Sequence, residues 1–121
     1  STRSGSVYAN DLRPLRKRVV REYFVRGTDN FKVAQRRAQT GDWEGAAQLW
    51  EKEVNNPDMK IAGRACYNMA IINEINGDLN AAMDWASKSY TDYDISNALR
   101  YVNILKNRLA NKRIIDHQLA R

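Results

Sequence analysis

The spacing of apolar residues along the chain is helical almost throughout. Apolar positions recur three or four residues apart, and no stretch sustains the every-second-residue alternation of a half-buried strand. Only six glycines and two prolines occur among the 121 residues, which also favours helices. The pattern therefore predicts an all-α fold. Its clearest stripe, near the C-terminal end, consists of Ile95, Leu99, Val102, Leu105 and Leu109.

A repeated Gly-Asp turn divides the middle of the chain. Residues 41–47 (GDWEGAA) return 36 positions later as residues 77–83 (GDLNAAM), a period within the range of helical repeat proteins. In each copy the glycine can adopt the left-handed conformation that ends one helix, and the aspartate can cap the next. The sequence therefore predicts two helix-turn-helix repeats, at residues 27–60 and 61–94.

Further helices are predicted on both sides of the repeats. Apolar residues at four-residue steps from Leu15 to Tyr23 indicate a helix over residues 12–26, after a loose leader at residues 1–11. The C-terminal stripe indicates a helix over residues 95–119. Two repeats alone bury their faces poorly, so we expect the flanking helices to cap them. The prediction is a single domain of about six helices.

The second repeat is marked by residues 65–70 (ACYNMA), 77–79 (GDL) and Ala82. The first is marked by residues 33–34 (VA), 41–43 (GDW), Ala46 and Pro57. At these positions the repeats resemble the tetratricopeptide family, and the resemblance implies a right-handed helical solenoid. The chain departs from the family pattern late in the first and second helices of each repeat, at Arg37 and Asn73 and at Glu53 and Ser89, which affects fine packing.

Four short segments suggest a second resemblance: residues 21–24 (REYF), 41–43 (GDW), 49–50 (LW) and 65–70 (ACYNMA). Through them the chain as a whole resembles uncharacterised repeat domains of Bacteroidales-type cell-envelope proteins. This resemblance carries no activity with it. It implies a location in the bacterial cell envelope, periplasmic or lipid-anchored through a targeting segment upstream of Ser1.

The residues needed for catalysis or metal binding do not form a set in this sequence. His117 is the one histidine and lies near the end of the chain, without a partner for proton transfer or metal ligation. Cys66, the one cysteine, falls at a helix position that normally faces the core. No glycine-rich phosphate loop occurs, and no apolar run is long enough to cross a bilayer. We therefore expect a protein that is not an enzyme and binds no cofactor or metal.

Charge is distributed unevenly along the chain. Residues 1–40 carry ten Lys and Arg against three Asp and Glu, and residues 95–121 carry six against one. Residues 41–94 have the opposite balance, four against ten. Acidic repeats between basic flanks favour attraction within one molecule or between copies, which salt would weaken. A homodimer is therefore one possible assembly.

The densest basic cluster raises the question of nucleic-acid or anionic-membrane binding. Phosphate binding requires several cations along one surface, but no aromatic residues interleave with these cations to stack on bases. We expect a solvated helix face instead. The cluster consists of Arg13, Arg16, Lys17, Arg18 and Arg21.

The family resemblance implies a concave groove formed by the first helix of each repeat. Its aromatic, aliphatic and amide groups suit an extended peptide or a partner helix, which predicts a protein-interaction scaffold. Alternatively, the N-terminal or C-terminal helix fills the groove, and the domain is structural or self-associating. Binding of anions or nucleic acid through the basic flanks is a third hypothesis. The predicted groove residues are Phe31, Gln35, Ala38, Arg64, Tyr67, Asn68, Ile71 and Glu74.

Overall fold

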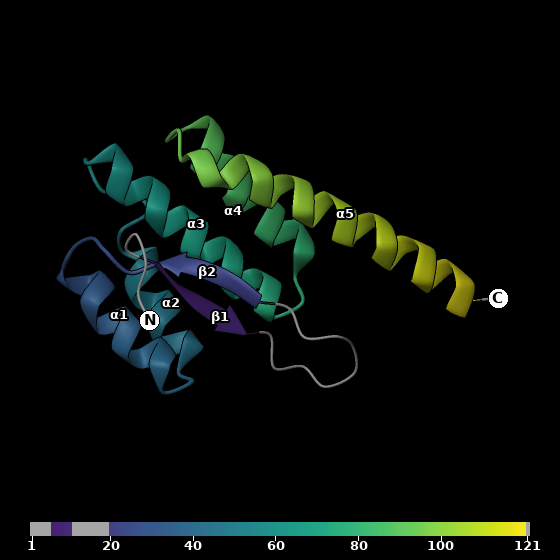
Figure 1. The fold of residues 1–121 in the computed structure, drawn as a ribbon, viewed down its shortest axis with the longest axis horizontal. Helices are drawn as coiled ribbons and strands as arrows, with labels where there is room; N and C mark the ends of the chain where they lie inside the picture. Colours follow the sequence, from purple (N-terminus) through teal and green to yellow (C-terminus); the bar gives the residue numbers. More distant parts are fainter. Residues whose placement is uncertain (1–5, 11–19, 121) are drawn as a thin grey trace.

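The described part of the protein is mostly helical, with one β-hairpin at its start. The structure is a computed structural model that describes residues 6–10 and 20–120, with side chains from Arg21 to Ala120. Within these ranges, five helices follow the hairpin (Figure 1). The elements are β1 (Ser6–Asn10), β2 (Val20–Phe24), α1 (Asp29–Gln39), α2 (Trp43–Glu51), α3 (Met59–Ile75), α4 (Leu79–Thr91) and α5 (Ser96–Leu119).

The two Gly-Asp turns connect helices as the sequence predicts. Gly41 and Gly77 have φ angles of 85° and 84°, in the left-handed region that glycine adopts without strain. The following aspartates cap the next helices: the Asp42 side chain accepts a hydrogen bond from the backbone of Gly45, and Asp78 accepts one from Ala81. These turns join α1 to α2 and α3 to α4.

Helix α3 lies at the centre of the packing. It contacts α2 and α4, its neighbours along the chain, and also β2, while α1 packs against α2 and α4 against α5 (Figure 1). The core between these elements contains large side chains with almost no exposed surface, among them Trp50, Phe31, Ile71 and Leu105. Strand β2 is therefore placed directly on α3, and the first half of α5 is placed relative to α3 through α4.

The N-terminal prediction is wrong where the structure describes it. Val20–Phe24 is a strand, and it pairs antiparallel with β1, so that Tyr23 lies opposite Val7. Ser6–Asn10, predicted as loose leader, is therefore also a strand. The reason lies in the side chains: Tyr23 and Val25 are buried whereas Glu22 and Arg26 are exposed, which is the two-residue period of a strand. The rest of the predicted helix, residues 12–19, lies outside the described residues.

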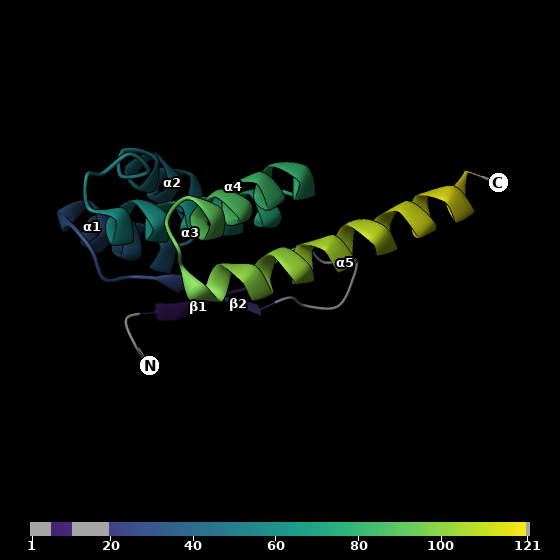
Figure 2. The same cartoon turned by 90° about the horizontal axis from the view of Figure 1, so that it is seen from above.

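Helix α5 is long and covers the body with only its first half. Its buried residues end at Leu109, and residues 110–120 are exposed. Seen from above, the C-terminal half of α5 extends beyond the other helices (Figure 2). Leu99, predicted in the buried stripe, is 46% exposed; Ala98 and Tyr101 are buried instead. No helix in the described ranges is long and apolar enough to span a membrane.

Gly63 tests how tightly α3 packs against the loop before α5. A methyl group at this position would lie 2.5 Å from Ile95 Cγ1 and 2.7 Å from Tyr93 Cβ. Gly63→Ala should therefore lower the free energy of unfolding by about 1–3 kcal/mol through overpacking. Urea denaturation measures this change, with Gln48→Ala on an exposed position of α2 as control, expected within about 0.5 kcal/mol of the parent chain. A free energy of unfolding that is the same for Gly63→Ala and the parent chain would contradict the packing described for this loop.

Candidate functional site

The predicted groove residues fall into two groups in the structure. Five predicted residues share one side of α3, because they lie three or four residues apart except for the adjacent pair Tyr67 and Asn68: Arg64, Tyr67, Asn68, Ile71 and Glu74. Four of them contact strand β2 or the residues beside it, as described below. The side chain of Ile71 is buried in the core.

The α1 residues do not form an open surface. Phe31 and Ala38 are buried in the hydrophobic core, and Gln35 is partly buried. Asn68 and Glu74 on α3 are at most 2% exposed. The prediction of an exposed groove is therefore wrong at these positions.

Asn68 holds the backbone of β2. Its side-chain Oδ1 accepts a hydrogen bond from the backbone N–H of Phe24 at 2.8 Å, and its Nδ2 donates to the Phe24 carbonyl at 2.7 Å. The amide group therefore offers the strand one donor and one acceptor, as the backbone of a neighbouring strand would. A short distance along α3, Arg64 Nη1 donates to the carbonyl oxygen of Arg26 at 3.1 Å.

Aromatic side chains of the strand pack on both sides of it. The Tyr23 ring meets Trp43 and Trp50 of α2 edge-on, with ring centroids 5.6 and 5.5 Å apart. The Phe24 ring lies 5.1 Å from that of Tyr67. Tyr23 is buried, so this side of the strand packs in the core.

Phe24 also has a cationic neighbour. The guanidinium carbon of Arg64 lies 5.2 Å from the centroid of the Phe24 ring, within the range of a cation–π interaction. Arg64 therefore contacts the strand twice, through this ring and through the Arg26 carbonyl.

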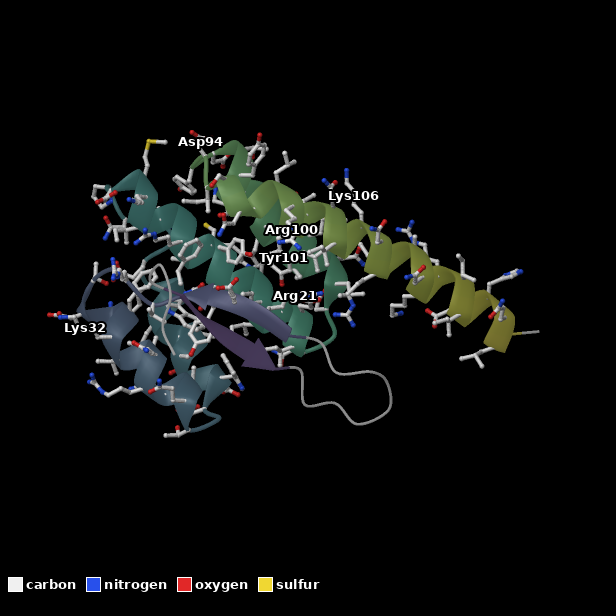
Figure 3. All side chains as sticks on the ribbon, viewed as in Figure 1. Arg21, Lys32, Asp94, Arg100, Tyr101 and Lys106 are labelled. Atoms are coloured by element: carbon white, nitrogen blue, oxygen red, sulfur yellow. The ribbon has the colours of Figure 1, made fainter. Side chains whose placement is uncertain are left out.

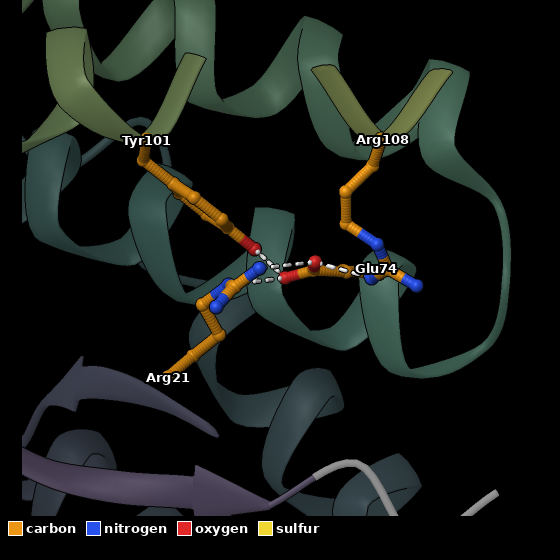
Figure 4. Close-up of polar contacts among 4 residues, drawn as sticks. All are labelled: Arg21, Glu74, Tyr101 and Arg108. Carbon is orange, nitrogen blue, oxygen red and sulfur yellow. Dashed lines mark hydrogen bonds and ion pairs between the residues drawn. The ribbon is translucent and has the colours of Figure 1, made fainter. Parts of the chain in front are cut away.

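Glu74 is the buried carboxylate on which the strand and α5 converge (Figure 4). Arg21, next to the start of β2, donates from Nε and Nη2 to the two carboxylate oxygens, each at 3.0 Å. From α5, the Tyr101 hydroxyl donates to Oε1 at 2.6 Å, and Arg108 Nη1 donates to Oε2. The double hydrogen bond between the Arg21 guanidinium and the Glu74 carboxylate is of a kind that is among the stronger polar contacts in proteins.

The same arginine also contacts an aromatic ring. The Arg21 guanidinium lies 5.8 Å from the centroid of the Tyr101 ring, and the two side chains meet between β2 and α5 (Figure 3). Tyr101 in turn lies 5.1 Å from Tyr67. Glu74, Arg21, Tyr101 and Arg108 are called the Glu74 cluster below.

The comparison with known proteins identifies the family. Residues 32–107 match the domain of unknown function DUF6340, over more than half of the chain. The chain belongs to the DUF6340 family. No curated protein and no solved structure matches it. The DUF6340 match contains α3 and the first half of α5, and therefore Asn68, Glu74 and Tyr101, whereas β2 lies ahead of it and Arg108 directly follows its last residue.

Burial raises the pKa of several side chains around the strand. The pKa of Tyr67 rises to about 12, and burial and the nearby Glu74 carboxylate raise the pKa of Tyr101. Both hydroxyls therefore keep their protons at neutral pH, and the hydroxyl of Tyr101 donates to Glu74. Burial also raises the pKa of the Cys66 thiol to about 11, which disfavours the reactive thiolate. Among the described residues, no group of His, Cys, Asp and Glu could hold a metal ion.

The sequence predicts the residues of α3 that contact the strand, but not the partners of Glu74. It predicts a solvated basic face for Arg21, and it does not predict Tyr101 or Arg108 as site residues. One signal was present: Glu74 stands at a helix position among Ile71, Ile72 and Ile75, where an acidic side chain is buried only with a partner. That signal indicates that partners exist, but the sequence does not indicate which cations supply them.

Replacing Asn68 tests the docking of the strand. Asn68→Ala removes both hydrogen bonds and leaves the Phe24 backbone groups without their partner, so the free energy of unfolding should fall by about 1–3 kcal/mol. Hydrogen exchange of the residue 20–26 amides should become faster, while that of α4 changes little. The matched control is Asn103→Ala, which removes an exposed amide from α5. Equal exchange at residues 20–26 in both variants would contradict the role given to Asn68.

Proposed function

We propose that this DUF6340 domain is a non-enzymatic protein-interaction scaffold whose α3 face binds an extended segment, and that the free chain fills this site with its own β2. The proposal includes a tetratricopeptide-like solenoid, in which α1–α2 and α3–α4 are the two repeats and α5 is the cap. The Gly-Asp turns at Gly41 and Gly77 support that arrangement. The observation that carries the proposal is the pair of hydrogen bonds between Asn68 and Phe24.

The contacts of β2 are those of a bound peptide. The helix face bonds to the backbone of the strand through Asn68 and Arg64, and Tyr67 and Glu74 on the same face contact its side chains Phe24 and Arg21. Recognition of an extended segment generally combines these two elements: backbone hydrogen bonds provide affinity, and side-chain contacts provide specificity. The backbone of any strand packed on a helix needs hydrogen-bond partners, and here an amide side chain of α3 supplies both a donor and an acceptor.

A second candidate function is that of a structural or self-associating domain of a larger envelope protein, with the groove permanently filled. The end of α5 favours it. This segment extends beyond the body (Figure 2) and exposes apolar side chains at Ile114, Ile115 and Leu119, the last of them 77% exposed. Exposed apolar residues in one segment are a common feature of surfaces that associate.

Anion or nucleic-acid binding has less support. Arg21, one member of the basic cluster, is engaged with Glu74 and partly buried. The other members, Arg13, Arg16, Lys17 and Arg18, lie outside the described residues.

Cutting the chain between the strand and the helices tests the scaffold proposal. A protease recognition sequence inserted between Gly27 and Thr28, where Gly27 is exposed, allows the folded chain to be cut after purification. We expect the released N-terminal fragment to stay bound at micromolar concentration, because its contacts with α3 do not depend on the connection. Size-exclusion chromatography with light scattering measures the mass of the complex, which should equal one fragment plus one helical body.

Matched variants show whether the α3 face is responsible. The cut Asn68→Ala chain should lose the fragment on the column, and the cut Asn103→Ala chain should retain it. If the fragment separates from the unmodified body while the body stays folded, the scaffold proposal is wrong. A measured mass twice that of the complex, unchanged at high salt, would favour the self-associating domain instead.

A further inference from the structure

The position of β2 on α3 is fixed at three points along its length. Arg21 meets Glu74, the Phe24 backbone meets Asn68, and the Arg26 carbonyl meets Arg64. Residue numbers rise along the strand while they fall along the helix, so the two run antiparallel. We infer that the α3 face selects an extended segment of a partner protein that carries arginine and, two and three residues later, aromatic side chains. This inference rests on the proposed function and names its ligand class.

The spacing of strand and helix makes the three points compatible. From residue 21 to 24 an extended chain advances about 10 Å, and the six residues between Asn68 and Glu74 advance about 9 Å along a helix. From residue 24 to 26 the strand advances about 7 Å, and the four residues between Arg64 and Asn68 advance about 6 Å. In a segment whose backbone is bound by Asn68 and Arg64, one residue occupies the position of Phe24 on Asn68. The side chain three residues before it then lies at Glu74.

The Glu74 end of the site is specific for arginine. Glu74 is almost completely buried, and both of its oxygens accept hydrogen bonds from the Arg21 guanidinium. Tyr101 adds an aromatic ring against that guanidinium. Lysine carries a single point charge and cannot form the planar double contact, and a neutral side chain would leave the carboxylate with fewer donors.

Aromatic side chains fit the other end. The position two residues after the arginine, Tyr23, lies against Trp43 and Trp50. The next position, Phe24, lies against Tyr67 and under the Arg64 guanidinium. These neighbours are aromatic rings and a cation, which favour an aromatic side chain over an aliphatic one.

The strand of the same chain competes with any such partner. A tethered segment acts at an effective concentration of the order of millimolar, so a free segment of equal affinity displaces little of it at micromolar concentration. Weakening only the tethered strand should therefore increase binding of a free one. The full-length Arg21→Ala chain has this property, because its α3 face is unchanged.

The test measures binding of a fluorescein-labelled synthetic peptide of residues 1–27 to full-length chains by anisotropy. The Arg21→Ala chain should bind this peptide at least about tenfold more tightly than the parent chain, since it lacks the arginine that holds its own strand. A peptide in which Arg21 is replaced by Ala should bind the Arg21→Ala chain at least about tenfold more weakly than the unmodified peptide. Circular dichroism confirms that each chain remains helical.

Arg26→Ala is the matched control chain, because it removes the same charge from an exposed position of the same segment. It should bind the peptide no better than the parent chain. The inference is wrong if the Arg21→Ala chain binds peptides with and without the arginine equally, or if it binds neither peptide. Hydrogen exchange at residues 20–26 that is no faster in Arg21→Ala than in Arg26→Ala would also overturn it. The cut fragment could remain bound in the earlier experiment while the Arg21→Ala chain shows no preference for the peptide with arginine. In that case the α3 face binds strands without selecting arginine.

Discussion

The rest of the structure depends on the burial of the Glu74 carboxylate. An ionised carboxylate taken out of water is costly unless donors surround it, and removing one partner of a buried pair generally destabilises strongly. In this fold the donors come from both ends of the described chain: Arg21 in β2, and Tyr101 and Arg108 on α5. Helix α3 is therefore joined by one carboxylate to the first strand that packs on it and to the last helix. The acidic repeats and basic flanks of the sequence have a structural meaning here, because a repeat glutamate meets one arginine from each flank.

The helical part of the fold could be predicted from the sequence because its signals are local. The glycines at 41 and 77 and the aspartates that follow them end one helix and cap the next within a few residues, so no distant contact is needed to recognise them. The three- and four-residue spacing of the C-terminal stripe likewise predicts α5, although it places Leu99 on the buried side. Five of the predicted groove residues lie on one side of α3 for the same reason, since helical periodicity places them there.

The N-terminal strand could not be predicted in the same way. Leu15, Val19 and Tyr23 are four residues apart and fit a helix, whereas the run from Val20 to Val25 is rich in β-branched and aromatic residues and fits a strand. The pairing with β1 and the amide of Asn68 stabilise the strand, and both partners are distant in sequence. Tyr101 and Arg108 are also distant from Glu74 in sequence, so the sequence does not indicate that they contact it. The predicted groove residues Asn68 and Glu74 are therefore buried, with hydrogen bonds to β2 and α5.

A double-mutant cycle between Arg21 and Glu74 tests the central claim most directly. The free energies of unfolding of Arg21→Ala, Glu74→Gln and the double variant are measured in urea against the parent chain, with the exposed pair Lys112 and Asp116 as a reference cycle. We expect Arg21 and Glu74 to be coupled by about 1–3 kcal/mol, because contacting groups in one polar network are not additive. The reference pair should be coupled by no more than about 0.5 kcal/mol. Additive effects of Arg21→Ala and Glu74→Gln would mean that the carboxylate does not hold the strand, and would contradict the claim.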